Sequence, residues 1–460
     1  MTKGSNPKSK HSVLVVPVVL LVLLSLLLSL PQPAWSEAAA EDSSKGEEDS
    51  SKGEQEGSEV AEASGNKLII LPPISYTPDS GLGSGVYVSY QRQYVNEPGQ
   101  TLSRPWRWNL CAIAMAYFKP KPIAWGFAGT FSWFPRFSPK LELGVILSSH
   151  GWNKDQWYGF GNASVRDLRQ RSPDDEISDP WHRFGLQQHR AAVSIYYRLH
   201  PQLDLFGALL VNYNHVTVGE NTLLKQQLDN GIVRAADSGL FLSIDAGIRL
   251  DTRNSRIDPE RGGLLLATGQ ATVRAGQLNE SDEQSAPASR HSGRIAVDVR
   301  GFISPPGAKV VLAGAAFLQR QFGRVPFYEL GVMLGPEAKP RHLTGAYGVR
   351  GLARGRLRDR DSLLLRGELR LRPPGFALGK LLRLRLEPIF FVDATRVGTL
   401  GVASPGPALH PSLGGGLRFI VEEQTLFRLD VGVAPEFQID DSGLHSRWNF
   451  GLYGTLYQSF

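Results

Sequence analysis

The sequence predicts an all-β protein, a 16-stranded antiparallel transmembrane β-barrel with both termini in the periplasm. The first observation is a period-two alternation of apolar and polar residues that begins at Lys67, because this period separates the two kinds of side chain onto opposite faces of a strand. The second is strand length: segments of about 10 to 14 residues cross a bilayer at a tilt of about 45°. The third is a mixture of long and short connections, typical of barrels with long outer loops and short periplasmic turns.

The alternation is clearest in three segments. In 240–251 every even position is apolar, whereas the odd positions include a serine, an arginine and two aspartates. The same pattern occurs in 294–300 and in 427–433. A soluble β-sandwich also alternates, but its strands are usually about five or six residues long. The alternation over longer segments therefore favours a membrane barrel.

Alternation and turn signals together predict sixteen strands, at 68–77, 82–94, 107–118, 123–134, 140–150, 185–198, 202–217, 238–251, 262–275, 291–303, 309–322, 361–373, 381–394, 412–422, 426–435 and 447–460. External loops are expected at 151–184, 218–237, 276–290, 323–360, 395–411 and 436–446. Internal turns are expected at 137–139, 200–201, 304–308, 373–380 and 422–424. In this count some of the later long loops fall on the wrong side of the barrel.

Residues 1–36 are predicted to be a signal peptide. Lysines precede an apolar run from Val13 to Leu30, and Ala34-Trp35-Ser36 supplies small residues at a cleavage site. An uncleaved anchor helix is the alternative.

Residues 37–66 are predicted to be an acidic disordered linker, and 67–460 the outer-membrane barrel. The linker holds the repeat EDSSKGE at 41–47 and 48–54, and its acidic residues greatly outnumber its two lysines. Such a segment has almost nothing to bury.

Composition excludes other classes. Only one apolar run approaches the length of a membrane helix, so the chain is not a polytopic helical membrane protein. The single cysteine, Cys111, excludes a disulfide framework. Residues 67–460 are basic, but export argues against a nucleic-acid partner.

No catalytic residue, cofactor or metal site is predicted, and the chain is expected not to be an enzyme. It contains no HExxH motif, Walker loop or EF-hand loop. Its histidines, among them His182, His189, His200 and His342, have no Ser or Asp partner at a recognisable spacing. A lipid-modifying enzyme therefore ranks below the other functions.

Four short motifs follow one another along the chain: LPPISYTPDSG at 71–81, YGFGN at 158–162, DTRN at 251–254 with Pro259 and Gly262, and VRG at 349–351. With the terminal strand ending in Phe460, they resemble the BamA/TamA-type bacterial surface antigen superfamily of outer-membrane barrels. The family has an aromatic residue after VRG, where this chain has Leu352.

The resemblance implies a location in the bacterial outer membrane. It implies contacts with outer-membrane lipids and lipopolysaccharide, and biogenesis by the barrel-assembly machinery, which would recognise the strand ending in Phe460. Whether the protein forms a homodimer is left open. The linker at 37–66 is too short for a POTRA domain, so a short member of the family without POTRA domains is expected. The insertase role of full-length relatives therefore cannot simply be assigned to this chain.

The resemblance also implies that the long loop at 323–360 folds into the lumen. Arg350, beside Gly351, would then meet Glu368 and Asp393, and a guanidinium suits such bidentate contacts better than an ammonium does. One interpretation is a lock that sets lumen shape and assembly. The alternative is that these are solvated lumen charges without particular partners.

Pro72 and Pro73 suggest a weak closing seam. Both lack an N–H group, so the first strand cannot form a full ladder with the last one. The seam could be a lateral gate or a lipid-perturbing edge, or the prolines could simply end a short first strand.

Two functions from different classes follow. One is outer-membrane assembly, or lipid or protein translocation, through the weak seam between the first and last strands. The alternative is a passive pore whose arginine-rich lumen passes anions or small solutes.

Overall fold

The computed structural model describes residues 66–77, 81–92, 108–119, 121–135, 138, 140–165, 180–233, 238–276, 291–333, 341–378, 382–399, 407, 409–421, 425–440 and 443–456. The predicted signal peptide at 1–36, the predicted linker at 37–66 except Asn66, and Phe460 lie outside the described residues. Asn66 already belongs to the first strand.

The long strands are β3 (Gly81–Arg92), β4 (Trp108–Lys119), β5 (Lys121–Trp133), β6 (Leu141–Gln156), β8 (Arg183–His200), β9 (Leu203–Val218), β10 (Gly239–Asp251), β11 (Gly262–Gly276), β12 (His291–Ile303), β13 (Val310–Gly323), β16 (Asp361–Leu371), β18 (Leu382–Gly398), β19 (His410–Val421), β20 (Thr425–Asp440) and β21 (Gly443–Leu456). The shorter ones are β1 (Asn66–Leu71), β2 (Ile74–Thr77), β7 (Ser164–Val165), β14 (Val332–Met333), β15 (Arg341–His342) and β17 (Phe376–Leu378). Three short helices complete the description: η2 (Pro180–His182), α2 (Leu223–Asp229) and η4 (Phe327–Glu329).

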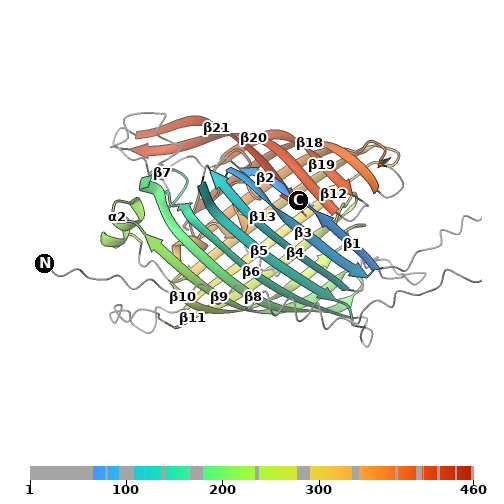
Figure 1. Ribbon diagram of the computed structural model, residues 1–460, viewed down its shortest axis with the longest axis horizontal. Coiled ribbons are helices and arrows are strands. Elements are labelled where there is room, and N and C mark those ends of the chain that lie inside the picture. Colours follow the sequence, from blue (N-terminus) through green and yellow to red (C-terminus); the bar gives the residue numbers. More distant parts are fainter. Residues whose placement is uncertain are drawn as a thin grey trace, which may run out of the picture. The chain divides into compact units, whose positions relative to one another are not determined.

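These strands form one antiparallel sheet that follows the order of the chain. β1 and β2 both pair with β3 and occupy its first position, and each later long strand pairs with the next as far as β21. Within the described residues the sheet has sixteen strand positions, which confirms the predicted count. Figure 1 shows the steep tilt of the strands and their progression from β1 in blue to β21 in red.

The alternation separates two faces of the sheet. On β10, Leu242 and Ile244 are exposed, whereas Ser243 and Asp245 are buried. Buried arginines and carboxylates line the inner face of β16, β18 and β20, and exposed leucine, valine and isoleucine cover the outer face. An apolar outer face around a polar interior is the arrangement of a transmembrane β-barrel. Among the described residues, no helix has the length and apolarity needed to cross a bilayer.

The ends of several strands differ from prediction. The expected loop at 436–446 is wrong, because β20 and β21 stay paired as far as Asp440 and Gly443. β6 and β18 likewise continue through Gln156 and Gly398. In β20 the alternation itself continues, because Phe437 and Ile439 lie between polar residues. In β6 the strand runs on through the polar residues 153–156, because a backbone ladder persists where the side chains are polar.

The connection between β3 and β4, at 93–107, is long and begins at one end of the sheet, whereas five other long connections share the opposite end. They follow every second strand, leaving β6, β9, β11, β13 and β18. Because successive strands are antiparallel, these five connections begin at the same end, which we call the outer end. The expectation that some later long loops fall on the other side is wrong. The turns after β8, β10, β12 and β16 lie at the opposite end, which we call the inner end.

Candidate functional site in the lumen

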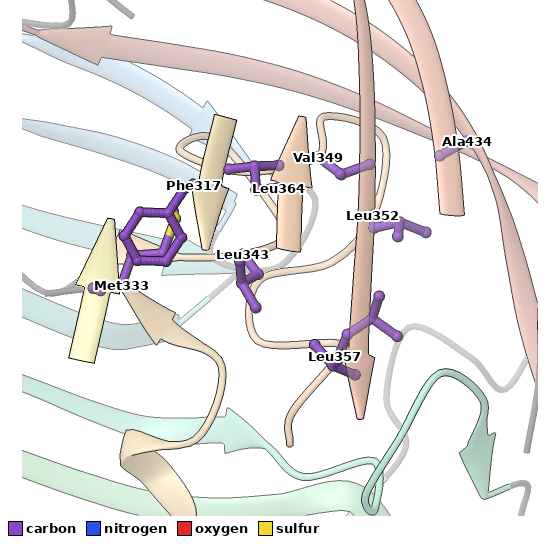
Figure 2. Close-up of a cluster of buried hydrophobic side chains, with 10 residues drawn as sticks. Phe317, Met333, Leu343, Val349, Leu352, Leu357, Leu364 and Ala434 are labelled. Carbon is purple, nitrogen blue, oxygen red and sulfur yellow. The ribbon is translucent and has the colours of Figure 1, made fainter. Parts of the chain in front are cut away.

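The connection between β13 and β16, residues 324–360, folds into the sheet instead of extending away from it; we call it the lumen loop. Its apolar side chains pack on buried residues of five strands, and Figure 2 shows them beside Phe317, Leu364 and Ala434 of three of these strands. The cluster comprises Met333, Leu343, Val349, Leu352 and Leu357 of the loop and Ala296, Phe317, Leu364, Val397 and Ala434 of the strands. Burying each leucine contributes about 1.5–3 kcal/mol. Apolar packing therefore holds the loop in the lumen in addition to any ion pair.

A second apolar cluster packs other outer connections against the lumen loop. Trp157, Trp181, Leu223 and Leu224 pack with Phe327 of η4. The indole Nε1 of Trp157 also donates a hydrogen bond of 2.7 Å to Oε1 of Gln227 on α2, which lies at the outer end in Figure 1. These connections form a packed unit at the outer end.

The YGFGN segment connects the chain that follows β6 to the lumen loop and to strands β18 and β20. Gly161 N donates to the Arg358 carbonyl at 3.1 Å. The side-chain amide of Asn162 bonds to the backbone of Val397 as a neighbouring strand would. Its Nδ2 donates to the Val397 carbonyl at 2.7 Å, and its Oδ1 accepts from Val397 N at 2.8 Å. β7 then pairs in parallel with β20. The segment thus reaches from β6 to β18 and β20.

Arg350 of the lumen loop binds carboxylates from three strands. Its Nε and Nη2 donate to the two oxygens of Asp393 on β18 at 2.7 and 2.8 Å. Its Nη1 donates to Glu368 on β16 at 3.2 Å and to Asp430 on β20 at 3.0 Å. The guanidinium carbon lies 3.3 Å from the centroid of the Phe391 ring. Arg350, Glu368, Asp393 and Asp430 form what we call the Arg350 cluster.

The Arg350 cluster is fully enclosed, with none of the arginine surface exposed. Burial alone lowers the pKa of the Arg350 guanidinium, but Asp393, Asp430 and Glu368 raise that pKa above its ordinary value. Three further arginines share the carboxylates. Arg428 donates to Glu368 at 2.7 Å and to Asp430 at 2.9 Å, Arg370 donates to Glu368 at 3.1 Å, and Arg366 donates to Asp393 at 3.4 Å. Removing one member of such a network leaves the buried groups that it contacted without a partner.

Gly351 brings the backbone of the lumen loop against the last two strands. Its φ of +109° suits glycine, and a Cβ built on it would lie 2.8 Å from Ala434 N on β20. Its N–H donates to the Tyr453 hydroxyl on β21 at 3.0 Å, and this hydroxyl donates to the Leu352 carbonyl at 3.0 Å. Gly432 completes the fit, because a Cβ there would lie 2.7 Å from the backbone carbon of Arg350.

Glu329 anchors the first part of the lumen loop on another wall. It pairs with Arg190 of β8 and, at 3.5 Å, with Nη2 of Arg294 on β12. Burial alone raises the pKa of Glu329, but the charges of Arg190 and Arg294 lower it overall, below the usual range. Glu329 therefore stays ionised at neutral pH.

The structure places the sequence-predicted residues as follows. Arg350, Gly351, Glu368 and Asp393 lie together, although their role as a lock stays a prediction. Sequence reasoning missed Asp430, Phe391 and Tyr453. Asp430 and Tyr453 do sit at inward positions of alternating strands, but nothing in the one-dimensional pattern identifies which inward residues meet the loop.

Pro72 and Pro73 separate β1 from β2. The register with β3 runs through this break, from Leu71 opposite Tyr87 to Ile74 opposite Ser84. Cα atoms of β2 and β21 come within 8 Å of each other, yet the described residues of β1 and β2 form no ladder with β21. The strength of this seam stays a prediction.

Metal-ligating groups were sought among the residues that the structure covers, and no cluster of three or more was found.

Comparisons with known proteins complete the description. No protein-family model matches the sequence, and no curated protein matches it. The fold is similar to that of BamA from Haemophilus ducreyi lacking POTRA domains 1–3, with 13% identity and a TM-score of 0.48 over 85% of this chain and 71% of that one.

Two CdiB structures are similar as well. CdiB from Acinetobacter baumannii has 12% identity and a TM-score of 0.45 over 85% of this chain and 60% of that chain. CdiB from Escherichia coli has 13% identity and a TM-score of 0.46 over 84% and 63%, respectively. This chain therefore spans less than two thirds of either CdiB chain.

Proposed function

We propose that this protein is an integral outer-membrane barrel of the membrane-assembly class, which acts on lipid or on protein segments at the seam between its first and last strands. The lumen loop keeps the lumen filled and stiffens the strands that lead to the seam. The partners proposed are outer-membrane lipids and lipopolysaccharide, with the barrel-assembly machinery acting during biogenesis. The rival proposal is a passive pore for anions or small solutes.

The observation that carries the proposal is where the lumen loop is fastened. Arg350 bonds to β16, β18 and β20, and the backbone at Gly351 bonds to Tyr453 on β21. The loop thus holds the strands next to the seam, at the edge that would have to move. A loop that only narrowed a pore would need no contact with the last strand.

The seam itself supports the same proposal. Successive residues of a strand direct their N–H groups to opposite edges, so one of the two prolines removes a donor on the side away from β3. A ladder between β1/β2 and β21 would therefore be incomplete. Each hydrogen bond contributes about 0.5–1.5 kcal/mol net, so a short ladder permits opening that a full one forbids.

A disulfide across the seam tests the proposal. In a Cys111→Ala background, a cysteine at Ser75 on β2 is combined in turn with cysteines at 452 and 454 on β21, which leave Tyr453 in place, and the pair that oxidises faster is kept. We expect oxidation to abolish lipid perturbation in reconstituted vesicles, and reduction to restore it. Replacing Pro72 and Pro73 with valine should weaken the same activity.

The matched control links strands that are already paired. Ser75 lies opposite Gly83 in the β2–β3 ladder, so a Ser75→Cys/Gly83→Cys disulfide stiffens the same strand without closing the seam. It should leave lipid perturbation unchanged. Equal activity in the oxidised seam variant, its reduced form and the control would overturn the proposal and favour the pore.

A further inference from the structure

The turn between β10 and β11, residues 252–261, lies at the inner end and folds beneath the lumen; we call it the inner turn. Asp258 is only 8% exposed, and Pro259 is buried as well. Short turns of transmembrane barrels usually meet water. The burial of an aspartate in such a turn therefore requires specific partners.

Three arginines supply those partners: Arg372 follows β16, Arg385 lies on β18 and Arg418 on β19. Asp258 Oδ2 pairs with Arg372 at 2.7 Å and with Arg385, and its Oδ1 pairs with Arg418 at 3.1 Å. Glu387 of β18 neutralises the same three arginines, at 2.8, 2.9 and 2.5 Å. Strands β12, β13 and β16 separate β11 from β18 in the sheet. The carboxylate thus reaches across three strand positions.

The inner turn is also held on its other side. Arg256 Nη1 lies 3.5 Å from Glu142 on β6, and Arg249 at the end of β10 pairs with the same carboxylate at 3.0 Å. Strands β8 and β9 lie between β6 and β10. Ion pairs therefore connect the inner turn to strands on both sides of its own hairpin.

One side chain connects the inner turn to the Arg350 cluster. Arg370 of β16 is fully buried. Its Nη1 lies 3.5 Å from the carbonyl of Pro259, and its Nε donates to Glu368 at 3.1 Å. Glu368 is also an acceptor for Arg350. A displacement of the inner turn or of the lumen loop therefore changes the contacts of the other segment through the guanidinium of Arg370.

We propose that the inner turn is a second plug, which closes the inner end of the lumen by docking Asp258 between Arg372, Arg385 and Arg418, and that Arg370 couples its docking to that of the lumen loop. Closure of the lumen by the inner turn does not require that the seam opens. Release of the inner turn would open the inner end and loosen the Arg350 cluster.

Limited trypsin digestion of the folded full-length protein in micelles tests the docking. Arg253 and Arg256 lie in the inner turn with side chains 8% and 18% exposed, so cleavage there reports undocking. We expect Asp258→Asn to be cut at these sites about tenfold faster than wild type or more, because one buried ion-paired carboxylate is lost. The control is Asp245→Asn, which removes a buried carboxylate of β10 that accepts a hydrogen bond from Gln270 on β11; it should be cut like wild type.

A milder variant covers the case in which Asp258→Asn does not fold. Arg385→Gln removes one of three partners, and its arginine is 19% exposed, so faster cleavage of the inner turn is expected with the barrel intact. Cleavage at the wild-type rate in a folded Asp258→Asn protein, or in Arg385→Gln if the first variant fails to fold, would overturn the plug.

Coupling has its own readout. A cysteine at Ala353 in the lumen loop, in the Cys111→Ala background, should react with a maleimide several-fold faster when Asp258→Asn, or Arg385→Gln in its place, is added. If the inner turn is cut faster but the rate of the maleimide reaction at position 353 is unchanged, the coupling through Arg370 is overturned, and the proposal that the inner turn is a plug is retained.

Discussion

Arg350→Ala is expected to unseat the lumen loop. The variant leaves Asp393 without its bidentate partner and deprives Glu368 and Asp430 of one donor each. Removing one member of a fully buried ion-pair network typically costs about 3–5 kcal/mol, because the remaining charges lose their compensation. We expect much faster proteolysis within 324–360 and a lower temperature for the loss of heat-modifiable mobility on gels.

Two variants sharpen this result. Arg350→Lys keeps the charge but cannot make three simultaneous guanidinium contacts, so it should rescue only part of the loss. Arg360→Ala removes a more exposed arginine of the same loop, whose Nη1 bonds only to the Gly323 carbonyl among the contacts described, and should behave like wild type. Wild-type proteolysis of Arg350→Ala would show that the cluster does not hold the loop.

Gly351→Val has the second largest expected effect, and it acts without changing charge. A φ of +109° is strained for any residue with a Cβ, and the Cβ would meet Ala434 N at 2.8 Å. Backbone strain and overpacking each cost about 1–3 kcal/mol. The two bonds of Tyr453 should then be lost together, and the lumen loop should become protease-sensitive while Arg350 is still present.

The matched control for Gly351→Val is Gly301→Val. Gly301 lies on β12, where an added Cβ would have no atom within 4 Å, and its valine should be tolerated in a strand. If both valine variants resist protease equally, close packing of the lumen loop on β20 and β21 is not required for its seating.

The strands were predictable because their signal is local. The alternation along 240–251, for instance, specifies which side chains face outward, and the structure confirms it. The end of β20 was missed although its signal is present, since Phe437 and Ile439 still alternate with Glu436, Gln438 and Asp440 beyond Pro435.

The interior was harder to predict because its contacts cross the lumen. Glu368 and Asp393 were connected to Arg350 only through a family resemblance, whereas Asp430 was recognised only as a polar-face residue of the 427–433 alternation, not as a partner of Arg350. Asp258 looked like an ordinary turn residue, and nothing near it in the sequence reveals three arginines more than 100 positions away. Such partners follow from sheet register and from the path of the loops.

Single-channel recording of the wild-type protein in planar bilayers tests the central claim most directly, namely that the lumen is plugged and that the protein acts at its seam. With the lumen loop and the inner turn both docked, we predict silence or rare brief openings, and steady current when Arg350→Ala and Asp258→Asn are combined so that neither is docked. A large, steady, anion-selective current from the wild-type protein would contradict the account and establish the pore.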